Sequence, residues 1–179
     1  MAVAEPVMRL AAEGRSAAES FESLYRRAFP RVYAYVASLL RDRSAAEEVT
    51  AQAFERAYRK RSTYRSGRGS AEAWLFGIAR HAALDELRRL KRRATLEGDP
   101  EDIHATTPDD HVDAIVRRAT VRAALAQLEP TERDLVALKF HGGLSNAEIG
   151  RVLGITESNV GTRLHRTMER LRRQCVELA

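Results

Sequence analysis

Apolar residues recur every three or four positions along most of this chain, a spacing that predicts α-helices. One such run begins near Phe21, and two more begin after the hydroxyl residues Ser44 and Ser70, which we expect to cap helices. Ser44 is followed three residues later by Glu47, the spacing of a capping box. Helical spacing resumes near Val112, and no segment alternates as a strand does. We therefore expect an all-α fold.

Residues 144–173 predict a short helix, a tight turn and a longer helix. Ser145 and Glu148 form a second expected capping box, and Gly154 suits a helix that ends through a left-handed residue. Thr156 is placed to cap the longer helix. One apolar stripe then follows the period of an α-helix and consists of Val160, Leu164, Met168 and Leu171.

The opposite face of this longer helix is polar and cationic. Its members are Ser158, Thr162, His165, Arg166 and Arg173, with Asn159 and Arg163 on the flank. An apolar back and a hydrogen-bonding, cationic front are what a helix in a DNA major groove needs. The alternative is an ordinary amphipathic hairpin with a solvated face. Such a face more often carries Glu and Lys of alternating sign.

The composition adds a domain division to this picture. The 179 residues are 44% hydrophobic and carry a net charge of +5, which favours a polyanionic partner. The charge is distributed unevenly along the chain. Residues 1–93 contain 19 basic and 11 acidic side chains, and residues 117–179 contain 11 basic and 7 acidic ones. Residues 94–116, between them, contain 7 acidic side chains and no basic one. We expect two small helical domains, residues 19–93 and 112–179, joined by an acidic flexible linker at 94–111, with residues 1–18 loosely ordered.

Residues 61–70 form a basic segment rich in Gly and Ser with one tyrosine, Tyr64. The composition favours a flexible surface loop, and the sharper alternative is a loop that holds an unpaired nucleotide with Arg65 and Arg68 on phosphates. The helix that follows ends in a cationic cluster made of Arg88, Arg89, Lys91, Arg92 and Arg93. This cluster exceeds what the helix dipole alone favours and fits a surface that contacts phosphates.

Nothing in the sequence indicates catalysis. The five histidines are scattered, none pairs with a second ligand at metal spacing, and no glycine motif for nucleotides is present. We expect no enzyme activity, no metal and no cofactor. Cys175 is the only cysteine, the first residues lack a signal peptide, and no apolar run is long enough to cross a bilayer. The expected location is the cytoplasm, without membrane insertion.

The chain resembles the extracytoplasmic-function (ECF) sigma factors of bacterial RNA polymerase over residues 21–93 and 112–173. The resemblance to the second conserved region of that family rests on residues 21–36, 46–59 and 74–89. The resemblance to the fourth conserved region rests on residues 128–150 and the helix-turn-helix. It implies a promoter-specificity subunit that directs transcription initiation. A partner anti-sigma protein wedged between the two domains commonly holds members of this family inactive.

The resemblance also implies roles for individual residues. The first domain would dock on the β′ clamp helices of core RNA polymerase through a helix containing Glu47, Glu48, Phe54 and Arg56. It would open promoter DNA at the −10 element through Tyr64, Arg65, Arg68, Trp74, His81, Asp85, Arg88 and Arg89. The second domain would pack on the β flap and read the −35 element through Ser158, Asn159, Thr162, Arg163, His165 and Arg166. A basic residue is usual in the family where Gly161 stands.

Two other functions are compatible with parts of this pattern. A stand-alone helix-turn-helix transcriptional regulator would use residues 20–93 to sense a ligand or to dimerise, and would therefore need an apolar cavity or seam there. An RNA-binding or adaptor protein would use the basic clusters without reading a sequence. The polar, Arg-rich character of residues 20–93 favours the sigma factor over both.

Overall fold

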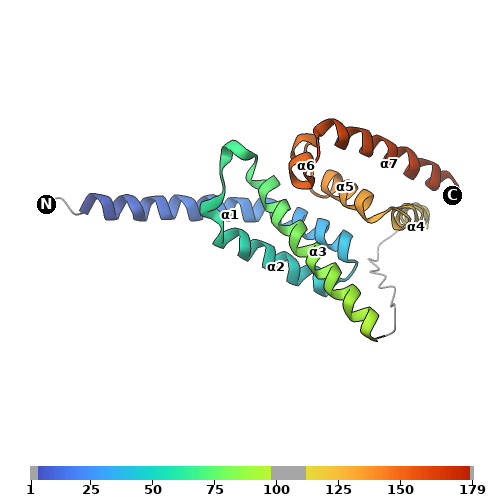
Figure 1. Ribbon diagram of the computed structural model, residues 1–179, viewed down its shortest axis with the longest axis horizontal. Helices are drawn as coiled ribbons and strands as arrows, with labels where there is room; N and C mark the ends of the chain where they lie inside the picture. The colour runs from blue at the N-terminus through green and yellow to red at the C-terminus, as the bar shows by residue number, and fades with distance from the viewer. Residues whose placement is uncertain (1–3, 98–111, 178–179) are drawn as a thin grey trace.

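The computed structural model describes the backbone of residues 4–97 and 112–177 and the side chains of residues 21–93 and 119–177. Within these ranges the chain is helical and contains no strand, which confirms the expected all-α class. Figure 1 shows two lobes, which we call the N-terminal lobe (residues 21–97) and the C-terminal lobe (residues 112–177). Residues 98–111, most of the expected linker, lie outside the described residues.

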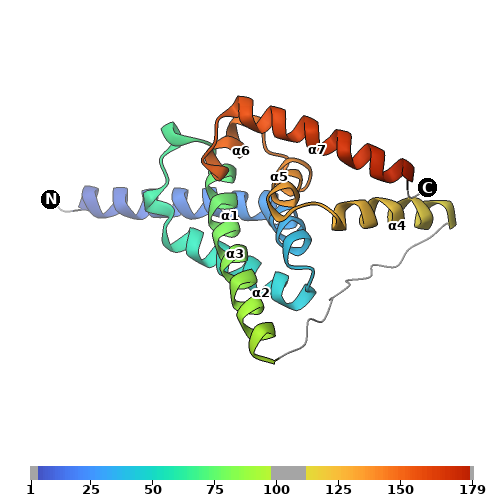
Figure 2. The ribbon, with the colours of Figure 1, turned by 45° about the vertical axis from the view of Figure 1, so that its right-hand side comes forward.

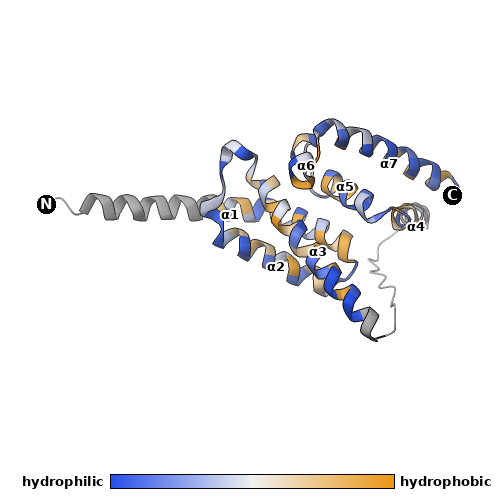
Figure 3. Cartoon of the chain, viewed as in Figure 1, coloured by the Kyte–Doolittle hydropathy of each residue, from blue (hydrophilic) through white to orange (hydrophobic). Residues whose placement is uncertain are grey.

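The N-terminal lobe packs three helices side by side. They are α1 (Ala4–Leu40), α2 (Arg43–Arg59) and α3 (Ala71–Glu97), and two short 3₁₀ turns, η1 (Arg61–Thr63) and η2 (Ser66–Arg68), connect α2 to α3. Pro30 lies inside α1, which nevertheless continues to Leu40. The inward positions of the three helices form the core of this lobe, and Figure 3 shows the hydrophilic residues on their outer sides.

Three helix boundaries differ from the sequence expectations. The first helix begins at Ala4 and not near Phe21, because residues 4–20 are rich in Ala and Glu, which are good helix formers. The third helix continues past Arg93 to Glu97. The cap of α2 is Asp42, whose carboxylate accepts a hydrogen bond from Ala45 N at 3.0 Å.

The capping box predicted from Ser44 is therefore wrong. Asp42 lies two residues earlier in an extended conformation, so Ser44 already belongs to the first helical turn. Glu47 instead accepts a hydrogen bond from Arg43 at 3.1 Å, one helical turn away. Arg41 makes the sharp change of direction between α1 and α2 possible by adopting a left-handed backbone with φ 57°.

The C-terminal lobe contains α4 (Val112–Ala126), α5 (Pro130–Phe140), α6 (Asn146–Leu153) and α7 (Glu157–Glu177). Pro130 occupies the first turn of α5, as its missing N–H favours. A small core between α4 and α7 contains Ala124, Leu128 and Leu171. Figure 2 shows α4 and α7 on the side of the lobe away from the N-terminal lobe, with α5 and α6 between them and α1 and α3.

The two lobes share one apolar core. Leu135 and Leu138 of α5 and Ile149 of α6 belong to the same buried cluster as Phe76 of α3 and Val36 of α1. The lobes therefore contact one another directly. The family resemblance places an anti-sigma protein between the two domains. In this conformation, side chains of the chain itself fill the space between the lobes.

Candidate nucleic-acid interface

The helix-turn-helix forms as the sequence predicts, because each of its corners is set locally. Ser145 Oγ accepts from Glu148 N at 3.3 Å and Glu148 Oε2 accepts from Ser145 N at 2.9 Å, which completes the capping box. Gly154 ends α6 in a left-handed conformation with φ 70°. Thr156 Oγ1 then accepts from Asn159 N at 3.2 Å and caps α7. These contacts fix the angle at which α7 leaves the lobe.

The two faces of α7 separate as expected. The buried positions are Val160, Leu164, Thr167 and Leu171, so Thr167 joins the stripe and Met168 is only half-buried. The structure brings all six predicted −35 residues to the solvent side of the helix, where Ser158, Asn159, Thr162, Arg163, His165 and Arg166 are all exposed. Figure 3 shows this outer side of α7 as largely hydrophilic. A continuous polar and cationic helix face is thus available to a duplex.

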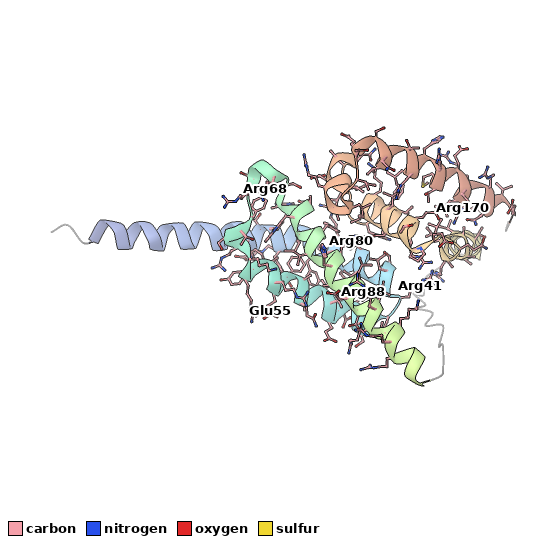
Figure 4. The ribbon with its side chains drawn as sticks, viewed as in Figure 1. Arg41, Glu55, Arg68, Arg80, Arg88 and Arg170 are labelled. Carbon is pink, nitrogen blue, oxygen red and sulfur yellow. The ribbon has the colours of Figure 1, made fainter. Side chains whose placement is uncertain are left out.

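The loop between α2 and α3 carries the predicted base-capture residues. Tyr64 donates a hydrogen bond from its hydroxyl to Gly69 O at 3.0 Å, and its ring lies 5.6 Å from that of Trp74. Arg65, which directly precedes η2, and Arg68, the last residue of η2, are both exposed, and Figure 4 shows Arg68 on the projecting loop. Two half-buried aromatic rings beside two exposed guanidinium groups suit a stacked base and its phosphates.

The remaining −10 candidates lie along α3. Asp85 pairs with Arg88 at 2.7 Å, and Arg89 pairs with Glu86 through two contacts of 2.7 Å. The hydrogen bonds that Arg89 donates to the Glu86 carboxylate raise the pKa of Arg89 above its ordinary value, so its charge is fixed at any working pH. His81 is exposed, and its Nδ1 lies 2.7 Å from Gly77 O. These groups share α3 with Trp74 and extend the cationic surface away from the loop.

The predicted polymerase-binding residues of α2 do not all face solvent. Glu47, Glu48 and Arg56 are exposed, and Glu48 accepts a hydrogen bond from Gln52 at 3.1 Å. Phe54 is only 4% exposed, because it packs against Tyr25 and other aromatic rings of α1. Direct contact of Phe54 with a partner is therefore excluded in this conformation. Phe54 supports the helix that presents its neighbours.

Sequence analysis missed the polar residues that join the lobes. Tyr35 donates a hydrogen bond to Asp134 Oδ1 at 2.7 Å, and Arg80 donates to Asp134 Oδ2 at 2.6 Å. Arg31 donates to Gly142 O, and Ser70 donates to Glu148. The only signal in the sequence was an acidic residue, Asp134, directly before the apolar Leu135 in a helix of ordinary composition. Such a residue is equally common on a solvated face.

The described residues contain no group of three or more His, Cys, Asp or Glu side chains able to hold a metal ion. No helix in the described part of the chain is both long and apolar enough to cross a membrane. The exposed face of α7, the loop and α3 share positive charge and hydrogen-bond donors, and the loop and α3 add the half-buried rings of Tyr64 and Trp74. That chemistry binds nucleic acid through phosphates, base edges and base faces.

Comparison with known proteins matches two parts of the chain to family models. The family model described as Sigma-70 region 2 matches residues 24–93, and the one described as Sigma-70, region 4 matches residues 118–171. The ECF RNA polymerase sigma factor SigL of Mycobacterium tuberculosis is 33% identical over 172 residues, covering 92% of this chain and 95% of that protein. The RNA polymerase sigma factor CarQ of Myxococcus xanthus is 35% identical over 165 residues, covering 90% of this chain and 92% of that protein.

Solved structures share the fold. The sigma factor RpoE in complex with the anti-sigma factor NepR from Bartonella quintana has a TM-score of 0.74 at 21% identity, covering 87% of this chain and 96% of that one. CnrH, solved in complex with the cytosolic domain of CnrY, has a TM-score of 0.65 at 20% identity, covering 89% of this chain and 92% of that one. With both conserved regions matched and relatives aligned over nearly their whole length, this chain belongs to the ECF sigma factors of RNA polymerase.

Proposed function

We propose that this sigma factor reads the −35 element through the exposed face of α7. The observation that carries the proposal is that all six candidate residues, from Ser158 to Arg166, are exposed on one face whose back is anchored by Val160 and Leu164. The caps at Ser145 and Thr156 hold this helix rigidly on the lobe. A rigid helix with Arg, Asn, Ser and Thr in front reads base edges in the major groove and holds the adjacent phosphates.

The N-terminal lobe supplies the −10 function in this proposal. Opening a duplex without ATP requires the flipped base to be bound tightly enough to offset an unpairing and unstacking cost of a few kcal/mol. Stacking on an aromatic ring supplies about 1–3 kcal/mol per base, and Tyr64 and Trp74 already lie beside one another for that purpose. Arg65 and Arg68 on the loop hold phosphates of the separated strand. His81, Asp85, Arg88 and Arg89 line its continuation along α3.

Core RNA polymerase, promoter DNA and an anti-sigma protein are the partners of this chain in the same proposal, and its location is the cytoplasm. The exposed Glu47, Glu48 and Arg56 of α2 contact the β′ clamp helices, and the C-terminal lobe contacts the β flap. Support for an anti-sigma partner comes from RpoE and CnrH, whose structures were solved in complexes with NepR and CnrY. This chain acts as a regulatory DNA-binding subunit, with catalysis supplied by the polymerase.

Transcription from a library of genomic fragments by core polymerase with this protein tests the proposal. Transcript starts that share one pair of −10 and −35 sequences are expected. Tight, specific duplex binding by the protein alone, without polymerase, would instead support the stand-alone regulator.

A pair of substitutions in α7 tests the −35 assignment. Arg166→Ala should lower transcription from promoters with an intact −35 element by roughly tenfold or more, because a base or phosphate contact is worth about 1–3 kcal/mol. Arg172→Ala is the matched control, since Arg172 lies on the same helix and its exposed side chain pairs with Glu169. Equal losses for the two variants, or an unchanged promoter preference for Arg166→Ala, would contradict the placement of the reading face.

The capture loop has its own test. Replacing Arg65 and Arg68 together by Ala should reduce transcription from duplex promoters more than from promoters already melted at the −10 element. The reason is that the melted template no longer needs binding energy for strand opening. Equal loss on both templates refutes the flipping role.

A further inference from the structure

One ring nitrogen of His81 is engaged within α3, and this contact fixes the chemistry of the other nitrogen. Nδ1 of His81 lies 2.7 Å from the carbonyl oxygen of Gly77, one helical turn earlier. A carbonyl oxygen can only accept a hydrogen bond, so Nδ1 must carry the proton. In the neutral imidazole, Nε2 is then unprotonated and is a hydrogen-bond acceptor. Because the side chain of His81 is exposed, a ligand can reach this acceptor.

His81 shares one face of α3 with an aromatic ring and an ion pair. Trp74, His81 and Asp85 follow one another at intervals of seven and four residues, which places them on the same side of the helix. Asp85 pairs with Arg88 at 2.7 Å, so His81 is the uncharged polar group between Trp74 and that pair. Figure 4 shows Arg68 on the loop and Arg88 further along α3, so a cation lies towards each end of this face.

A gap in the side chains separates Trp74 from His81. Gly77 lies between them, and a Cβ there would meet no atom within 4 Å apart from its chain neighbours and the backbone of its own helix. The fold therefore does not require glycine here, although glycine is unfavourable inside a helix. The Cα atoms of Trp74 and His81 are about 10 Å apart along the helix axis, and a stacked base occupies about 3.4 Å of that length. The gap can thus hold one base close to the backbone.

We propose that His81 selects the base that enters this gap, favouring adenine or cytosine over guanine or thymine. This selectivity rests on the proposed function, because it concerns the separated strand that follows α3. Adenine and cytosine carry an exocyclic amino group, which donates to Nε2 of His81. Guanine and thymine carry a carbonyl oxygen at the same position, and two acceptors that face one another form no hydrogen bond. Trp74 stacks on any base and supplies affinity without selection.

Nitrogen NMR of the free full-length protein tests the tautomer. Long-range 1H–15N correlation spectra distinguish a protonated from an unprotonated ring nitrogen, and the signal that disappears in His81→Phe assigns His81. At mildly alkaline pH, His81 should show a protonated Nδ1 and an unprotonated Nε2. His165 is an internal reference that should show both tautomers, because it is exposed on α7 and its ring has no hydrogen-bond partner among the described residues. A proton on Nε2 of His81 in place of Nδ1 would overturn the proposal.

Base selection is measured by fluorescence, because Trp74 is the only tryptophan of the chain. A base that stacks on Trp74 quenches its emission, so a titration reports binding at this site. The probes are short strands of abasic nucleotides that carry a single adenine, cytosine, guanine or thymine. Cytosine is compared with thymine and adenine with guanine, so that ring size is matched within each pair. Cytosine and adenine should each bind about fivefold more tightly than their counterparts, which is the effect of one hydrogen bond.

Two substitutions separate reading by His81 from stacking on Trp74. His81→Phe keeps a ring without nitrogen, so all four bases should still quench Trp74 while both affinity ratios fall to near one. His81→Gln carries an amide that can donate or accept, so its ratios should fall as well. Glu55→Gln on α2, an exposed change away from α3, should keep the wild-type ratios. The proposal is overturned if His81→Phe keeps the wild-type ratios, if guanine and thymine bind more tightly, or if no base quenches Trp74.

Gly77→Ala tests the gap itself. The added methyl group enters open space, so the variant should unfold at the wild-type temperature or above it. The backbone carbonyl that holds His81 remains in place. Binding of all four strands should nevertheless weaken severalfold, because the methyl group occupies the space that a base needs. Undiminished binding by a folded Gly77→Ala would show that no base enters the gap.

Transcription separates this inference from the proposed function. With core polymerase and promoters randomised across the −10 element, the wild type should prefer adenine or cytosine at one position, and His81→Phe should lose that preference. A preference for guanine or thymine at the position that His81→Phe affects would contradict the inference. If even the wild type directs no promoter-dependent starts, the proposed function fails, while the tautomer and the base ratios of the free protein still decide the role of His81.

Discussion

Two glycines of the helix-turn-helix should respond in opposite ways to the same substitution by alanine. Gly161 lies inside α7, and a Cβ there would meet only Asn146 Nδ2 at an ordinary 3.7 Å. A glycine in a helix interior is less favourable than alanine by about 1 kcal/mol. Gly161→Ala should therefore raise the free energy of unfolding by about 0.5–1 kcal/mol. For a chain of this size that corresponds to a rise in Tm of roughly 1–4 °C.

Gly150 of α6 provides the matched control. A Cβ at Gly150 would lie 2.7 Å from Ile155 O and 3.5 Å from Glu157 N, both of them backbone atoms that cannot rotate away. Gly150→Ala must force the turn apart and should lower the free energy of unfolding by roughly 1–3 kcal/mol. Urea denaturation followed by far-ultraviolet circular dichroism measures both variants. A destabilised Gly161→Ala, or a Gly150→Ala as stable as wild type, would show that α6 and α7 do not cross as the structure has them.

Two other perturbations probe the N-terminal lobe. Thr50 is fully buried, and its hydroxyl has no hydrogen-bond partner among the described residues. Thr50→Val should therefore keep the shape of the side chain and raise the free energy of unfolding by about 1 kcal/mol in urea denaturation. A loss of stability would mean that the hydroxyl is hydrogen-bonded in solution. For Glu72, burial raises the pKa, but hydrogen bonds from Arg27 and Arg31 outweigh it and the net pKa is lowered. The contribution of Glu72 to stability is present above its unfolded pKa of about 4.3 and is lost as the pH falls through the lower pKa of the folded state. Glu72→Gln should therefore flatten the decline in the free energy of unfolding over that acidic range. A decline as steep as in the wild type would contradict this.

The parts of the fold that sequence analysis predicted correctly are those fixed by neighbours along the chain. The Ser145 capping box, the left-handed Gly154 and the Thr156 cap each depend on residues within four positions, and all three are confirmed. The Ser44 cap was wrong for an equally local reason. Asp42 competes for the same helix start, and the left-handed Arg41 decides between them. A sequence pattern with two adequate caps does not say which is used.

The contact between the lobes was beyond the reach of such patterns. Tyr35 and Asp134 are 99 positions apart, and neither stands out from its local composition. Arg80 illustrates the difficulty further, because it belongs to an Arg-rich helix whose cations all suggest phosphate contacts. Only its place on the inner side of α3, half-buried against Asp134, distinguishes it from the exposed Arg88 and Arg89. The candidate DNA-contacting residues were predictable as exposed cationic faces. Tyr35, Arg80 and Asp134, which join the two lobes, were not predictable in this way.

Two carboxylates accept hydrogen bonds from the opposite lobe, and they differ in the partners that they have within their own lobe. Glu148 accepts from Ser145 N and Oγ through Oε2 and from Ser70 through Oε1, while Ser70 Oγ itself accepts from Ala73 N at 3.1 Å. Without the contact between the lobes, Glu148 would still cap α6 and Ser70 would still cap α3, because both caps are made within one lobe. Asp134 has no such local partner among its described hydrogen bonds, since both of its oxygens are bound by the other lobe. Asp134 therefore depends wholly on the other lobe for its hydrogen bonds, whereas Glu148 does not, and the buried apolar cluster that the two lobes share contributes to the same contact.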